Sequence, residues 1–132
     1  MRSRIVLADD ESDLRMVYGS FLRAIGYEVY EAADGDEAVS LVLEKCPCLL
    51  LLDVWMPKFN GFEVLERLRH EPRATNVKVV MLSNLADSDT RLEGFAVGVA
   101  DYWLKTSSLL ELQDRLAVLL GQGEAELSPD SK

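Results

Sequence analysis

Short apolar runs alternate with longer amphipathic segments along this chain, and this alternation restricts the fold more than any other feature. The runs are too short for helices, so they predict strands at residues 4–8, 27–32, 48–54, 77–83 and 101–105. Segments with helical spacing follow each of them, at about residues 12–25, 35–45, 62–70, 88–97 and 108–120. The sequence therefore predicts a strand followed by a helix, five times over.

Strands that alternate with helices favour a parallel sheet, because right-handed crossover connections place helices on both of its faces. The unbroken apolar run "CLLLL" at residues 48–52 fits a strand that is buried on both sides. We expect an α/β fold with a doubly wound, five-stranded parallel sheet of order 2-1-3-4-5, the flavodoxin-like arrangement.

The length of 132 residues suits one domain. The apolar stripe of the first helix is predicted to comprise Leu14, Val17, Tyr18, Phe21 and Ile25, with Gly26 as its stop signal. The apolar stripe of the last helix is predicted to comprise Leu109, Leu112, Leu116, Leu119 and Leu120, with Leu110 and Ala117 on its shoulder and Val118 facing away.

Small, acidic and turn-forming residues follow the last helix, so we expect a domain over residues 1–120 and a tail or linker over residues 121–132.

The charge balance restricts the partners. Fourteen basic residues stand against 23 acidic ones, and the net charge of -9 disfavours direct binding to nucleic acid or to anionic membranes. No apolar run approaches the roughly 20 residues of a membrane span, and two acids come too early for a signal peptide. We expect a cytoplasmic protein.

Polar groups follow four of the five predicted strands. Asp9 and Asp10 come after the first strand, Asp53 ends the third, Ser83 ends the fourth and Lys105 ends the fifth. In an open parallel sheet the ligand crevice lies outside the carboxyl ends of the strands, where the winding direction reverses. The expected strand order makes the first and third strands neighbours, so the three aspartates should meet there.

Three crowded carboxylates repel one another, so either one is protonated or a cation lies among them. Oxygen ligands without histidine or thiolate suit Mg²⁺. With Lys105 and Ser83 added, the group forms a receptacle for a phosphoryl group, and one carboxylate could be the nucleophile that forms an aspartyl phosphate. Taken singly, Asp9 or Asp10 is also explained as a helix cap.

These elements together resemble the receiver domain of bacterial response regulators in two-component signalling. The resemblance covers residues 4–120 and lies in "LADDE", "LLLLDVWMPKFNGFEVL", "MLSN" and "DYWLK". It implies that Asp53 is the phosphoacceptor, that Ser83 and Lys105 bind phosphoryl oxygens, and that Mg²⁺ is held by Asp10, Asp53 and the Trp55 carbonyl, with Asp9 assisting through water.

The resemblance also implies how the domain works. A histidine kinase or phosphotransfer protein would donate the phosphoryl group, and Ser83 and Tyr102 would form a switch that changes the face of the fourth helix, fifth strand and fifth helix. That face would control a partner or an output domain, and we expect phosphorylation to strengthen a homodimer through it. The domain would be a regulator that catalyses only its own aspartyl phosphorylation and dephosphorylation.

Three features depart from the family pattern, one of them the bulky, apolar pair Trp55 and Leu85 at positions that flank the path of the hydrolytic water in this family. Thr106 follows Lys105 where proline is usual, and Asn84 follows Ser83 where a small residue is usual. A second hypothesis therefore stays open, in which the chain is a receiver-like scaffold that binds proteins without taking up phosphate. A phosphatase of the haloacid dehalogenase class is disfavoured, because it needs a second acid where Trp55 stands.

Overall fold

The computed structural model describes residues 3–83, 99–105 and 108–121. Its strands are β1 (Arg4–Ala8), β2 (Glu28–Ala32), β3 (Leu49–Asp53), β4 (Lys78–Ser83) and β5 (Asp101–Leu104). Its helices are α1 (Ser12–Ala24), α2 (Gly35–Lys45), α3 (Gly61–Arg69) and α5 (Leu109–Leu120), with a short 3₁₀ turn at Pro72–Ala74. The expected helix at 88–97 and the tail from 122 onward lie outside the described residues.

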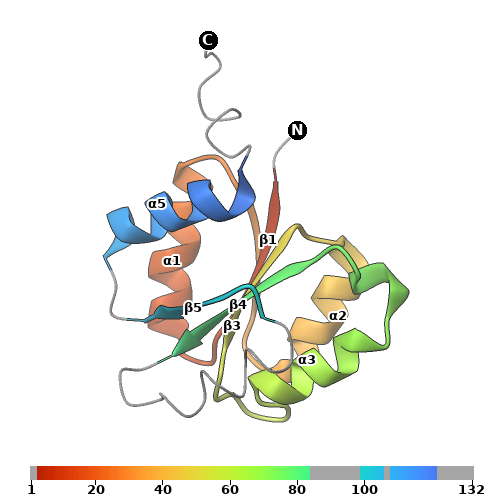
Figure 1. Ribbon diagram of the computed structural model, residues 1–132. Coiled ribbons are helices and arrows are strands. Elements are labelled where there is room, and N and C mark those ends of the chain that lie inside the picture. Colours follow the sequence, from red (N-terminus) through yellow and green to blue (C-terminus); the bar gives the residue numbers. More distant parts are fainter. Residues whose placement is uncertain (1–2, 84–98, 106–107, 122–132) are drawn as a thin grey trace.

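The described strands form one sheet of order β2-β1-β3-β4-β5, in which every neighbouring pair is parallel. The predicted α/β fold and strand order are therefore confirmed. Helices α1 and α5 lie on one side of this sheet, and α2 and α3 lie on the other (Figure 1). Within the described ranges, no helix is long and apolar enough to cross a membrane.

The four leucines of β3 explain how this sheet is fixed between its helices. Successive side chains of a strand point to opposite faces. Leu49 and Leu51 join the core cluster that includes residues of α1 and α5, whereas Leu50 and Leu52 join the cluster that includes residues of α2 and α3. All four are fully buried, and each contributes roughly 1.5–3 kcal/mol of hydrophobic stabilisation. The strand that ends at Asp53 is thus held from both faces.

The prediction for α1 was wrong at one residue. Val17 is 51% exposed, while Leu22, which lies outside the predicted stripe, is fully buried. Residues four apart lie on the same face of a helix, so Tyr18 and Leu22 form the centre of the buried face and Val17 lies about a quarter turn away. The helix ends as expected before Gly26, whose φ of 113° is a conformation that glycine adopts readily.

The prediction for α5 agrees with the structure in outline. Leu112, Leu116 and Leu120 are buried, and Leu109 and Leu119 are partly buried against the same cluster. Two apolar side chains of this helix remain on its surface, since Leu110 is 72% exposed and Val118 is 83% exposed. The outward position of Val118 was predicted.

Candidate functional site

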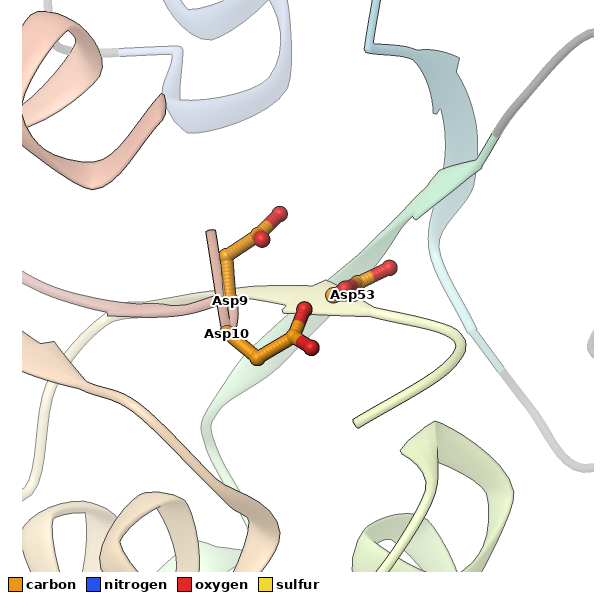
Figure 2. A group of neighbouring side chains, drawn as sticks. All are labelled: Asp9, Asp10 and Asp53. Atoms are coloured by element: carbon orange, nitrogen blue, oxygen red, sulfur yellow. The ribbon is translucent and has the colours of Figure 1, made fainter. Parts of the chain in front are cut away.

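The carboxyl ends of β1 and β3 bring three aspartates together. Ala8 pairs with Leu52 in the sheet, so Asp9 and Asp53 come one position later on two adjacent strands. One carboxylate oxygen from each of Asp9, Asp10 and Asp53 lies within 4.8 Å of the others. Figure 2 shows the three side chains gathered at these strand ends. Asp9 and Asp53 are buried, whereas Asp10 is exposed.

Lys105 supplies the cation that faces these acids. Its Nζ lies 3.1 Å from Oδ2 of Asp9 and 3.4 Å from Oδ2 of Asp53, and its side chain is only 8% exposed. A third acid, Glu11, has Oε2 at 3.8 Å from the same Nζ. One ammonium therefore balances two buried carboxylates, and the buried group carries an excess of negative charge when both acids are ionised.

The two oxygens of Asp9 have different surroundings. Oδ1 accepts a hydrogen bond of 2.8 Å from the amide of Glu11. Glu11 is itself the N-cap residue of α1, and no side chain of the described residues caps the start of this helix, so the explanation of Asp9 as a helix cap is wrong. Oδ2 is fully buried and, although Lys105 lies near it, accepts no hydrogen bond from the described residues. This oxygen lies 3.1 Å from the Nζ of Lys105, and that ion pair offsets part of the cost of its burial. Oδ2 fits a cation site, because a hard divalent ion takes carboxylate oxygens as ligands.

Burial changes the acidity of the group. Burial and, after it, the charge of the nearby Asp9 raise the pKa of Asp53 to about 7, although Lys105 and the amide of Trp55 act in the opposite direction. Burial likewise raises the pKa of Asp9, against the hydrogen bond from Glu11 and the charge of Lys105. Burial alone would lower the pKa of Lys105, but Asp53 and Asp9 outweigh it and raise that pKa. Lys105 is therefore charged at neutral pH.

The other predicted site residues lie at neighbouring positions. Ser83 ends β4 and is 3% exposed, and its carbonyl accepts a 2.9 Å hydrogen bond from the amide of Lys105. Tyr102 is 5% exposed and packs in the cluster that includes α2 and α3, so its side chain points inward. Trp55 is 55% exposed, and its amide donates to Oδ1 of Asp53 at 3.3 Å. Asn84, Leu85 and Thr106 lie outside the described residues.

The loop after β3 is fixed by the start of α3. Asn60 and Glu63 cap this helix reciprocally, through hydrogen bonds of 2.8 and 2.9 Å. The amide of Gly61 donates to the carbonyl of Val54 at 2.7 Å. A Cβ at position 61 would lie 2.8 Å from the carbonyl oxygen of Asp53, so only glycine allows α3 to begin this close to the acid.

Sequence reasoning missed two contributions to the site. Glu11 extends the acidic run after β1, and this run is visible in the sequence as three consecutive acids. Tyr18 was predicted only as a core residue, but its hydroxyl donates to the backbone carbonyl of Lys105 at 2.9 Å. No local pattern could reveal this second contact, because 87 positions separate the two residues.

The fold is similar to those of solved signalling proteins. Chemotaxis protein CheY4 of Vibrio cholerae superimposes with a TM-score of 0.84 at 27% identity, covering 89% of this chain and 98% of that one. The receiver domain of the sensor histidine kinase PA1611 from Pseudomonas aeruginosa superimposes with a TM-score of 0.83 at 26% identity, covering 92% and 99%. The latter structure has a magnesium ion coordinated in its active-site cleft.

Sequence comparisons define the family. A family profile of the response regulator receiver domain matches residues 5–117, and the chain therefore belongs to this family. The "probable transcriptional regulator ycf27" of Porphyridium aerugineum is 38% identical over 119 residues, which are 90% of this chain and 48% of that protein. The chain thus spans about half the length of the curated relatives that it matches.

Membership settles the general role of the domain. It is the receiver domain of a two-component response regulator. Domains of this family are regulatory rather than classical enzymes, interact with kinases and typically bind Mg²⁺. The acidic group of Asp9, Asp10 and Asp53 agrees with that chemistry.

The raised pKa of Asp53 predicts a pH-dependent stability in the absence of Mg²⁺. The unfolded acid releases its proton near pH 4, whereas the folded acid holds it until about pH 7. The folded state binds more protons in that window, so its free energy of unfolding should fall by roughly 3 kcal/mol as the pH rises from about 4 to about 7. Urea unfolding in EDTA at a series of pH values measures this effect.

Asp53→Asn is the matched control, because the amide has nearly the same shape and does not titrate. The difference in stability between Asp53→Asn and the wild type should grow with pH across the window, and saturating Mg²⁺ should reduce it. Parallel pH profiles for the two proteins would show that Asp53 is not an acid of raised pKa.

Proposed function

We propose that this domain accepts a phosphoryl group on Asp53 in a Mg²⁺-dependent reaction and controls a partner or an output domain through the resulting change. The observation that best supports this proposal is the position of Asp53. Its carboxylate is buried at the end of a strand that is fixed from both faces, beside Asp9 and with the Nζ of Lys105 at 3.4 Å. A nucleophile held in this way needs little reorganisation before it reacts.

Asp9, Asp10, Asp53 and the backbone carbonyl of Trp55 are the groups that would hold Mg²⁺, with Asp9 acting through water. When bound, the ion would neutralise the negative charge of the acids and of the incoming phosphoryl oxygens. The buried Oδ2 of Asp9, which accepts no hydrogen bond from the described residues, supports such a site. The carboxylate cluster offers the oxygen ligands that this ion prefers.

The proposed reaction is a direct transfer. A carboxylate oxygen of Asp53 attacks phosphorus, the new P–O bond forms an acyl phosphate, and the P–N bond to the donor histidine breaks. The electron pair of that bond stays on the imidazole, which leaves with the donor, a histidine kinase or a phosphotransfer protein. Lys105 and Ser83 lie at neighbouring strand ends and would bind the phosphoryl oxygens.

The switch would combine Ser83 with Tyr102. We propose that Ser83 moves toward the phosphoryl group and that the inward position of Tyr102 is favoured in the phosphorylated state. Tyr102 already occupies a buried position against the sheet. The change would be reported by the face of the fourth helix, β5 and α5.

We propose that residues 1–120 form the receiver unit, that residues 121–132 are a tail or the start of a linker, and that the domain works in the cytoplasm. The net charge of -9 supports a role without direct contact to nucleic acid or membrane. A curated relative of about twice the matched length is described as a transcriptional regulator. Control of transcription through a partner or an output domain is accordingly the downstream role that we favour.

Uptake of phosphate tests the proposed function. Incubation with acetyl phosphate and Mg²⁺ should add one phosphoryl group per chain, visible by intact mass spectrometry. The addition should disappear in EDTA and in Asp53→Asn, because the first removes the neutralising cation and the second removes the nucleophile.

Glu44→Gln provides a control, since this exposed acid lies in the last turn of α2, at the opposite edge of the sheet from Asp53, and its variant should be phosphorylated like the wild type. Folded wild type that takes up no phosphate from several donors would favour the phosphate-independent scaffold instead.

Exposed apolar residues support the further proposal of a phosphorylation-strengthened homodimer. Leu110 and Val118 of α5 are exposed, and Leu104 of β5 is 36% exposed. Burial of such residues between two copies would stabilise a dimer.

Sedimentation velocity with and without beryllofluoride, a phosphoryl mimic, tests this association. The mimic should raise the dimer fraction, and Val118→Lys should lower it because a charge would then face the partner. Met16→Lys, on the exposed surface of α1, should leave the dimer unchanged. A monomer at every concentration, with and without the mimic, would contradict the proposal.

A further inference from the structure

Tyr18 of α1 contacts Lys105, a site residue that lies 87 positions later in the sequence. It lies on the buried face of α1 and is only 6% exposed. Its hydroxyl donates a hydrogen bond of 2.9 Å to the backbone carbonyl of Lys105. Packing in the core needs only the ring of a tyrosine, whereas a buried hydroxyl needs a partner. The partner here belongs to the residue that faces both buried aspartates.

The backbone of Lys105 is thereby held at both ends. Its amide donates to the carbonyl of Ser83 at 2.9 Å, as the last contact of β5 with β4. Its carbonyl accepts from Tyr18 on the other side. With both groups fixed, the side chain leaves the backbone in one direction, and its Nζ reaches Asp9 and Asp53 at 3.1 and 3.4 Å.

The same helix also holds the opposite member of this ion pair. Arg15 lies three residues before Tyr18 in α1, and its Nη1 donates a hydrogen bond of 2.6 Å to the backbone carbonyl of Asp9. Arg15 in turn lies 3.6 Å from Glu31 of β2, which keeps its side chain in place. Helix α1 thus contacts the backbones of both Asp9 and Lys105, and it sets the separation of the two charged groups.

Resting on the function proposed above, we propose that Tyr18 is a positioning residue, whose hydroxyl holds the ammonium of Lys105 between Asp9 and Asp53 for phosphoryl transfer. The hydroxyl remains a donor over the working range, since burial and the charge of Asp9 raise the pKa of Tyr18. A held ammonium has two consequences. It is ready to bind phosphoryl oxygens, and it competes with Mg²⁺ for the same carboxylates.

These consequences give Tyr18→Phe an unusual signature. The variant keeps the buried ring and loses only the hydroxyl. Loss of the contact should slow phosphoryl uptake from acetyl phosphate about fivefold at saturating Mg²⁺. The loosened ammonium should compete less well, so Mg²⁺ itself should bind about twofold more tightly, as measured by calorimetry without any phosphodonor. Tyr18→Leu, a second variant without the hydroxyl, should move both quantities in the same directions.

Two reference proteins make the test specific. Tyr30→Phe also removes a tyrosine hydroxyl, one that donates to Glu28 away from the site, and should change neither quantity. In a Lys105→Ala background, Tyr18→Phe should no longer affect Mg²⁺ affinity, because the competing ammonium is absent. Urea unfolding of each variant verifies that it is folded.

Unchanged uptake and unchanged Mg²⁺ affinity in Tyr18→Phe would overturn the proposal. So would a parallel loss of both, since general loosening of the site weakens ion binding as well. If the wild type took up no phosphate, the proposed function would fail separately, and the calorimetric comparison would still show whether Tyr18 positions Lys105.

Discussion

Two buried aspartates share one lysine ammonium in this domain, and the surrounding structure holds that arrangement against its own electrostatic cost. Removing Asp9 and Asp53 from water disfavours their charged forms, and their mutual repulsion adds to this penalty. Lys105 compensates only in part. When both acids are ionised, the site therefore carries excess negative charge. A divalent cation can neutralise this charge by binding the available carboxylate oxygen atoms.

The sheet and α1 together maintain this arrangement. The leucines of β3, buried in alternation on both faces, prevent Asp53 from moving out of the site. The contacts of Arg15 and Tyr18 hold the backbones of Asp9 and Lys105 from one helix. The sheet and α1 thus hold the carboxylates of Asp9 and Asp53 close to the ammonium of Lys105, where the acids are shielded from water.

The sequence was sufficient for the fold and for the prediction that Asp9, Asp53 and Lys105 lie close together, because both depend on local patterns and on a general rule of parallel sheets. Period and composition revealed the strands, and the position of polar residues at strand ends placed Asp9, Asp53 and Lys105 together. The prediction that Val17 is buried was wrong because α1 has apolar residues on more than one side. The sequence alone does not show which of these sides faces the sheet. It missed the hydroxyl of Tyr18 because its partner is distant in the chain.

Locating the phosphoryl group is the most direct test of the account. After incubation with acetyl phosphate and Mg²⁺, borohydride reduction converts an aspartyl phosphate into homoserine, and peptide mass spectrometry then identifies the modified position. Homoserine is expected at position 53 alone, since Asp53 combines a fixed carboxylate with the adjacent ammonium of Lys105. Homoserine at Asp9 or Asp10, with position 53 unmodified, would contradict the assignment of Asp53 as the nucleophile.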